Sequence, residues 1–559
     1  MGEDASGVQP TPSDSLRELV LRHRSEITTV IVYAICVGLF TLATPIAVQA
    51  LVNTVAFGTL MQPLLVLATA LVALLSVSGA LKALKFRAVE VIQRRIFVET
   101  ISRIAFSLPC ADARALERAG GEHLVHRYFD LFVVQKSLAS LLLGGVDVVL
   151  AALVGMLVLA FYHPFLLAFD LALIGMLLLV VLGLGRGGIK TAIAESTSKY
   201  DIANFLSDVA DATCAYRDRG GMAFAHARVD ELAQKYLVTR AAHFDVVFRQ
   251  FSGAMLVQVL ASAGLLGLGG WLVIERELSL GQLVAAELIV TMLVNTIAQL
   301  VKYTDTYYEL VTAGYKLQGL IALPTEQQSG DRGVEVEGKP VALTIRDLHA
   351  TVGSRTLFAG AELELPAGAK VALVGPAESG KSYLIDLFFG LQRPTRGHIE
   401  LDGTDVRELS RAALRERVAV VHGPEIVSGT VIENIRLGRD DISSGRVRSL
   451  LEDLGLAEEL LRLPDGLETK LSSSGWPLST SQALRVTIAR AIARSPGLLA
   501  IDAPLSTINS DSLQRVLGFL ARPHAPWTLI VAAAEAQVLP YCDRVVRLEG
   551  QRFEQEKLE

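Results

Sequence analysis

One short loop in the sequence has the residue types and the spacing that bind phosphate. Residues 375–382 read GPAESGKS and fit the pattern GxxxxGK(S/T). Glycine lets backbone N–H groups approach phosphate oxygens, and the amino end of a following helix adds partial positive charge. Lys381 would reach the outer phosphates, and the Ser382 hydroxyl could bind Mg²⁺. The pattern predicts a phosphate site formed by Gly375, Pro376, Ala377, Glu378, Ser379, Gly380, Lys381, Ser382 and Tyr383.

A lone carboxylate at the end of an apolar stretch could complete that site. Residues 498–506 read LLAIDAPLS, a run typical of a buried strand that ends at Asp502. A strand neighbouring the strand of the phosphate loop would bring this carboxylate near the magnesium ion, directly or through water. These residues therefore predict a phosphate-bearing ligand bound together with Mg²⁺.

The elements that must position these residues have the order of an α/β nucleotide-binding domain. Residues 370–390 read KVALVGPAESGKSYLIDLFFG, which predicts an apolar strand, a tight loop and an amphipathic helix. Sequence of this style, with mixed charges and short apolar strands, begins at about Val341. We therefore expect a cytosolic domain at 341–559, preceded by a polar linker at 323–340.

The part of the chain before the linker has the composition of a membrane protein. The 559 residues are 51% hydrophobic but only 6% aromatic, and the apolar residues concentrate in this first part. One apolar run could be a buried core helix, but several in succession predict a transmembrane bundle, which we place at 17–322 after a disordered tail at 1–16. Six runs approach or exceed the roughly 20 apolar residues that cross a bilayer: 27–55, 60–82, 137–161, 164–185, 250–274 and 280–301.

The charges on the links between these runs predict the orientation. The short links at 57–62, 162–164 and 275–280 carry one basic residue, Arg276, whereas the two long links are rich in Lys and Arg. The positive-inside rule places the long links and both termini in the cytoplasm. We expect a multi-pass protein of the cell membrane, plasma or inner.

Three carboxylates fall within the predicted spans: Asp147, Asp170 and Glu287. An ionisable group in the hydrocarbon is costly and marks a candidate substrate pathway. Two other interpretations stay open, because Asp147 could lie at the cytoplasmic interface and any of the three could pair across the bundle.

The ordered set of motifs resembles a half-transporter of the ATP-binding cassette (ABC) exporters, over nearly the whole chain. Residues 108–130 (LPCADARALERAGGEHLVHRYFD) are similar to the first cytoplasmic coupling segment of that family, and 428–438 (SGTVIENIRLG) to the stretch after its glutamine loop. Residues 478–504 resemble the signature, its helix and the Walker B strand in order. The resemblance implies a six-helix membrane bundle fused to a P-loop ATPase domain. It also implies a second half-transporter as partner, because two such domains sandwich two ATP molecules.

Two alanines stand where the resemblance implies catalytic side chains. Ala503, directly after Asp502, takes the place of the glutamate that polarises the attacking water, and Ala534 that of the switch histidine. No catalytic residue is then intact, and the loss of a general base typically costs about 10² to 10⁴ in rate.

Three further departures concern nucleotide contacts. His422 replaces a glutamine that senses Mg²⁺; a neutral imidazole could still ligate the metal, but a solvated loop histidine is the simpler interpretation. Val352 stands about where an adenine-stacking aromatic is expected, and Glu378 puts an acid inside the phosphate loop. The signature reads LSTSQ in place of LSGGQ, and its candidate contacts to the partner's nucleotide are Ser479, Thr480, Ser481 and Gln482.

These patterns predict a chain that binds Mg-ATP but hydrolyses it slowly by itself. It would work as half of a dimeric exporter, with a heterodimer favoured over a homodimer. The alternative is a pseudo-ATPase scaffold or regulatory subunit, which the altered signature favours. The net charge of −6, without a basic patch interleaved with aromatic residues, gives no sign of a nucleic-acid partner. The transported substrate cannot be read from the sequence.

Overall fold

The computed structural model describes residues 17–558 except 19, 58–60, 279, 327–329, 334–337 and 533–536. The chain divides into two compact units, Met1–Glu326 and Gln327–Glu559. The expected linker contains this division. Pro324 accepts a hydrogen bond from the Asp112 amide within the first unit (2.8 Å), whereas the Arg332 amide donates to Glu408 within the second (3.2 Å). The expected tail at 1–16 lies outside the described residues.

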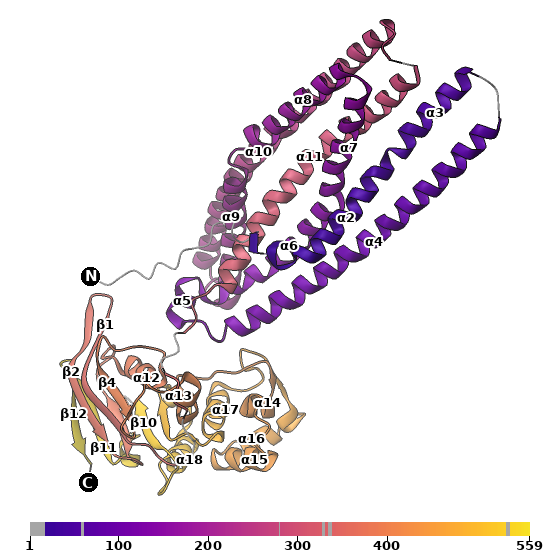
Figure 1. Ribbon diagram of the computed structural model, residues 1–559. Helices are drawn as coiled ribbons and strands as arrows, with labels where there is room; N and C mark the ends of the chain where they lie inside the picture. Colours follow the sequence, from indigo (N-terminus) through magenta and orange to yellow (C-terminus); the bar gives the residue numbers. More distant parts are fainter. Residues whose placement is uncertain are drawn as a thin grey trace. The chain divides into compact units, whose positions relative to one another are not determined.

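The first unit is built from long helices that run alongside one another (Figure 1). Apolar side chains dominate them, as the hydrocarbon core of a bilayer requires, and the helical form lets the backbone satisfy its hydrogen bonds internally. The elements are α2 (Arg24–Thr41), α3 (Ala43–Phe57), α4 (Met61–Ser107), α5 (Ala113–Arg118), η1 (Gly121–Phe129), α6 (Asp130–Ser140), η2 (Leu141–Gly145), α7 (Val146–Tyr162), α8 (Pro164–Leu178), η3 (Leu179–Leu184), α9 (Gly188–Asp211), α10 (Arg219–Ile274) and α11 (Leu280–Ile321).

Among the described residues, five helical segments are long and apolar enough to cross a membrane. They contain the first five predicted spans in whole or in large part, and the second, third and fifth segments extend well beyond their spans on the side of the long links. The sixth predicted span, 280–301, lies in α11, where the apolar stretch of described residues is the shorter Val284–Leu293. These segments are Arg24–Val52, Leu64–Ser107, His123–Tyr162, Pro164–Leu184 and Arg219–Ile274.

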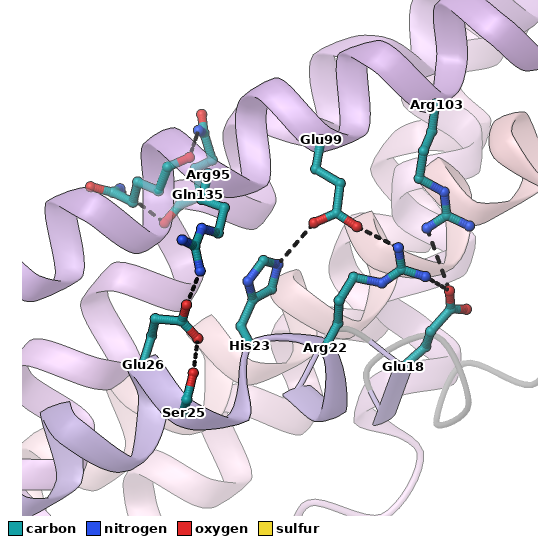
Figure 2. A network of polar contacts seen from close by, with 10 residues as sticks. Glu18, Arg22, His23, Ser25, Glu26, Arg95, Glu99, Arg103 and Gln135 are labelled. Atoms are coloured by element: carbon teal, nitrogen blue, oxygen red, sulfur yellow. Dashed lines mark hydrogen bonds and ion pairs between the residues drawn. The ribbon is translucent and has the colours of Figure 1, made fainter.

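Ion pairs join the start of the chain to α4. Figure 2 shows Arg22 and His23 facing Glu99, and Glu18 facing both Arg22 and Arg103. The Arg22–Glu18 and Arg103–Glu18 separations are 2.8 and 3.4 Å. Because the Glu18, Arg22, Glu99 and Arg103 side chains are partly exposed, each pair among them is expected to contribute at most about 1 kcal/mol. They fix the approach of the chain to the first long helix more than they stabilise the fold.

The three carboxylates of the predicted spans have different surroundings. Asp147 forms an ion pair with the buried Lys85 of α4, which is the cross-bundle pairing left open above. Asp170 is buried in α8, and neither of its side-chain oxygens has a hydrogen-bond partner among the described residues. Glu287 is exposed on α11.

The second unit contains a mainly parallel sheet and an antiparallel sheet, with helices beside them (Figure 1). The larger sheet has the order β12-β11-β3-β10-β9-β6, and its strands β3, β9 and β10 are short apolar runs that lie in the core. Its members are β3 (Lys370–Val374), β6 (Val418–Val421), β9 (Leu498–Ile501), β10 (Thr528–Ala532), β11 (Arg544–Glu549) and β12 (Arg552–Lys557).

The antiparallel sheet has the order β2-β1-β4-β5. It comprises β1 (Leu343–Val352), β2 (Arg355–Leu365), β4 (Arg396–Leu401) and β5 (Thr404–Asp405); a separate pair is β7 (Gly429–Thr430) with β8 (Lys470–Leu471). The helices and turns are α12 (Lys381–Phe389), α13 (Arg411–Arg417), α14 (Val431–Arg436), α15 (Ser444–Asp453), α16 (Ala457–Leu461), η4 (Gly466–Glu468), α17 (Thr480–Ala493), η5 (Leu505–Thr507), α18 (Ser510–Leu520) and η6 (Leu539–Tyr541).

Candidate functional site

The predicted phosphate loop joins the carboxyl end of β3 to the amino end of α12. Gly380 has a φ of +97°, and a Cβ there would lie 3.1 Å from the Phe358 ring, so the turn into α12 favours glycine. The Lys381 ammonium donates to the carbonyl oxygens of Gly375 (2.7 Å) and Pro376 (2.8 Å). The loop therefore curls around its own lysine, at the end of a helix where backbone N–H groups face outward.

Tyr383, at the third position of α12, takes a different direction. Its hydroxyl donates to the carbonyl of Arg393 at 3.2 Å. The side chain thus helps to hold the segment after α12, so a contribution of Tyr383 to phosphate binding would come from its backbone.

Asp502 follows β9 directly, and its amide donates to Val421 at the end of β6 (2.8 Å). The expectation that its strand neighbours the strand of the loop is wrong, because β10 pairs with both β3 and β9 and lies between them. The carboxylate nevertheless reaches the first turn of the loop helix, where it accepts a hydrogen bond from Ser382. This bond and the hydrogen bond from His422 lower the pKa of Asp502. A parallel sheet brings the carboxyl ends of its strands to one edge, so the contact is possible although one strand, β10, lies between β3 and β9.

His422 lies between two carboxylates. Its Nε2 is 3.1 Å from Asp386 Oδ1 on α12, and its Nδ1 is 3.5 Å from Asp502 Oδ2. Hydrogen bonds to Asp386 and Asp502 raise the pKa of His422 to about 10. His422 is thus half-buried between two carboxylates that favour its protonated form, in place of the solvated loop histidine expected from the sequence, and its contact with a metal stays a prediction.

The remaining residues fit a magnesium ion at the end of the loop. Ser382 and Asp502 supply a hydroxyl and a carboxylate in contact with each other, and Mg²⁺ takes oxygen ligands while keeping several waters. His422 would then lie close to the metal, because its Nδ1 is in contact with the Asp502 carboxylate.

Ala503 is partly buried and packs against the apolar core of the second unit. It presents a methyl group directly after the Asp502 carboxylate. Ala534 lies outside the described residues, and its place at the switch histidine position stays a prediction. Val352 ends β1 and is 47% exposed.

The predicted signature residues form the start of α17. Ser479 is the N-cap, its hydroxyl accepts from the Gln482 amide, and the Gln482 side chain accepts from the Ser479 amide at 2.9 Å. Thr480 is exposed, and the Ser481 hydroxyl has no hydrogen-bond partner among the described residues. This capping box leaves the remaining first-turn N–H groups at the helix end, where they can meet an anion.

A buried charge pair that the sequence reasoning missed anchors this helix. Arg485 is only 1% exposed and donates from one guanidinium nitrogen to both oxygens of Glu459 on α16, at 2.9 Å each. Gln482 donates to the same carboxylate at 2.8 Å. The only signal in the sequence was an arginine on the apolar face of a helix, which does not name its partner.

Comparison with known proteins gives a consistent result. Residues 358–506 match the family described as ABC transporter. The chain is 28% identical to the ATP-dependent lipid A-core flippase of Chromohalobacter salexigens over 62% of this chain and 60% of that protein. It is 27% identical to the mycobactin import ATP-binding/permease protein IrtB of Mycolicibacterium thermoresistibile over 54% of this chain and 53% of that one. The alignments thus span about half to three fifths of these two relatives.

A solved structure matches the fold over almost the full length. The structure of a bacterial Atm1-family ABC exporter with ATP bound superposes with a TM-score of 0.82, at 21% sequence identity, covering 96% of each chain. The chain therefore shares the fold of that exporter chain, with long apolar helices followed by an α/β domain, and the match of 358–506 to the ABC transporter family implies ATP binding by that domain.

Proposed function

We propose that this chain binds Mg-ATP as one half of a dimeric ABC exporter and hydrolyses it only slowly by itself. One observation carries the proposal: Lys381, Ser382 and Asp502 lie at one edge of the sheet, and the residue after Asp502 is an alanine. The side chains expected to bind phosphate and magnesium are present. The side chain expected to polarise the attacking water is replaced by the methyl group of Ala503.

The chemistry of each group supports this division. The Lys381 ammonium and the backbone N–H groups of the loop would neutralise the phosphates, and Ser382 with Asp502 would hold the magnesium ion. The metal supplies charge neutralisation at the transferring phosphate. Without a carboxylate at 503, the attacking water has no nearby base, which typically costs about 10² to 10⁴ in rate.

The partner is proposed to be a second ABC half-transporter, and a heterodimer fits the site better than a homodimer. A partner with an intact glutamate and switch histidine would supply one site that hydrolyses ATP. Ser479 and the amino end of α17 would face the nucleotide of that partner, although the side chains of Thr480 and Ser481 restrict the close backbone approach that glycine permits.

A second candidate function rests on the same signature. If the substituted LSTSQ turn cannot close on a partner's phosphate, the chain would act as a pseudo-ATPase scaffold or regulatory subunit that ATP gates without turnover. The extended cytoplasmic helices and the full helical bundle favour transport over this alternative. Fold alone does not decide between them.

Substrate and direction belong to the proposal as well. The relatives named above are a lipid A-core flippase and a mycobactin import protein, so proteins similar to this chain differ in cargo and in named direction. We propose export across the cell membrane, plasma or inner, with the second unit in the cytoplasm.

Purification from the native membrane, with mass spectrometry of whatever accompanies the chain in equal amount, tests the partner. A second half with an intact glutamate supports the heterodimer, whereas recovery of only this chain favours the pseudo-ATPase. ATP turnover by the isolated chain at roughly 1 s⁻¹ or faster, the ordinary range for such enzymes, would refute slow hydrolysis. In the same preparation, Ala503→Glu should raise turnover by about 10² or more, while Lys381→Ala removes ATP binding.

A further inference from the structure

Glu378 is the unusual residue of the phosphate loop. It has a φ of +62°, a left-handed conformation that non-glycine residues rarely adopt, and its side chain is 78% exposed. An acidic side chain in this loop would repel a bound triphosphate. The loop would thus oppose its own ligand unless another group cancels that charge.

Arg355, the first residue of β2, supplies such a group. Its Nη1 donates to Glu378 Oε2 at 2.7 Å. Both residues line one cavity of about 520 Å³, together with Pro376, Ala377 and Ser379 of the loop, and the charged Glu549 and Arg552 line the same space. The pair therefore joins the edge of the antiparallel sheet to the loop that is expected to hold the phosphates.

We propose that Arg355 is a nucleotide-positioning residue of this chain, which neutralises Glu378 and holds the acidic phosphate loop in a form that accepts a nucleoside triphosphate. The inference rests on the proposed ATP binding. Lys381, Glu378 and Arg355 together carry a net charge of +1, because two cations face one anion. Without Arg355 the net charge is zero, and the loop would present an unpaired carboxylate beside the ligand.

The exposure of the pair determines where its effect appears. Arg355 is 57% exposed, so the pair adds little to the stability of the fold. A triphosphate brings several negative charges to the loop, and their repulsion by a carboxylate that is not neutralised adds over those charges. The loss of Arg355 should therefore lower the affinity for ATP and leave the unfolding temperature unchanged.

Calorimetric titration of the full-length protein with ATP and Mg²⁺ tests the inference. Arg355→Ala should weaken ATP binding about tenfold at low ionic strength, and less in 0.5 M salt, because salt screens exposed charges. Arg355→Lys, which retains the charge, should stay close to wild type. Glu378→Gln should restore affinity to Arg355→Ala, since it removes the carboxylate that needs neutralising.

Arg396→Ala is the matched control. Arg396 is 74% exposed and pairs with Asp347 at 3.0 Å in the same unit, and it does not line this cavity. Unchanged ATP affinity in Arg355→Ala would overturn the inference while leaving ATP binding intact. A loss that Glu378→Gln fails to rescue would also overturn it, because Arg355 would then act on the nucleotide directly. A wild-type chain that binds no ATP would overturn the proposed function and this inference together.

Discussion

At the scale of single residues, the substitution expected to affect the magnesium site most is His422, which stands where the family resemblance implies a glutamine. It is in contact with Asp502, the carboxylate expected to hold magnesium, and with Asp386 on the loop helix. Hydrogen bonds that the ring donates to both carboxylates raise the pKa of His422 to about 10, which favours the cationic ring at neutral pH. A histidine in this position therefore engages the metal ligand and also opposes a divalent cation.

We expect His422→Gln to increase the extent to which Mg²⁺ strengthens ATP binding. Glutamine is uncharged, and its amide oxygen can accept a hydrogen bond from a metal-bound water. The ratio of ATP affinity with Mg²⁺ to ATP affinity with EDTA, measured by calorimetry, should rise about fivefold or more.

His398→Gln provides the comparison, because His398 pairs with a carboxylate, Glu400 at 3.4 Å, in the same unit. An unchanged ratio in His422→Gln would show that His422 does not compete with the metal.

At the scale of elements, the helix of the signature depends on a charge pair below its surface. Arg485 on α17 and Glu459 on α16 form that pair, and Arg485 also donates to the Gly455 carbonyl at 3.1 Å. The same carboxylate, Glu459, also holds the signature turn in place, because the Gln482 side chain donates to it.

Glu459→Ala should destabilise the second unit by about 3 kcal/mol, because it leaves a buried guanidinium without its carboxylate. Thermal unfolding of the full chain, followed by intrinsic fluorescence, should show a lower midpoint for the transition of this unit. Glu458→Ala, at the exposed neighbouring position, should have little effect. Equal midpoints for the two variants would contradict the role assigned to the pair.

A second element-scale feature is the break between η3 and α9. Gly185 accepts a hydrogen bond from the Tyr308 hydroxyl at 3.3 Å, and a Cβ on Gly188 would lie 2.4 Å from Tyr308 Cζ. Tyr308 is buried and also bonds to Gln250 of α10 at 3.2 Å. The helices α9, α10 and α11 thus pack closely at this point, because Gly185 and Gly188 have no side chain.

Gly188→Ala should destabilise the first unit by about 1–3 kcal/mol, because overpacking displaces a buried ring. Gly267→Ala, at a helical position of α10 with nothing within 4 Å of the added Cβ, serves as control. Thermal unfolding in detergent should separate the two variants. Comparable melting would mean that Tyr308 moves aside without cost.

At the scale of the whole molecule, orientation in the membrane is the property that can be tested directly. The link between α9 and α10 contains the exposed Cys214, and the link between α10 and α11 contains Glu275. The charge distribution predicts that these two links lie on opposite sides of the bilayer.

A membrane-impermeant maleimide should label Cys214 only after permeabilisation of the cells. In a chain with Cys214→Ser, a cysteine introduced by Glu275→Cys should be labelled in intact cells, and Cys214→Ser alone reports any background from the other cysteines. Labelling of position 275 only after permeabilisation would reverse the predicted topology.

The sequence by itself determined the parts of this protein that depend on local composition and short spacing. Long apolar runs predicted spanning helices, and GPAESGKS after an apolar run predicted the strand, loop and helix of the phosphate site. Each of these patterns lies within one segment of the chain, so it can be recognised without knowing which other segments pack against it. The order of the motifs added the exporter architecture.

Only the tertiary structure decided which side chains meet. The placement of β10 between β3 and β9, the charge on His422, and the pairs Arg485–Glu459 and Arg355–Glu378 all join residues from separate elements. A hydrogen bond or a pKa depends on distances of a few ångströms, and the sequence specifies those distances only after the chain has folded.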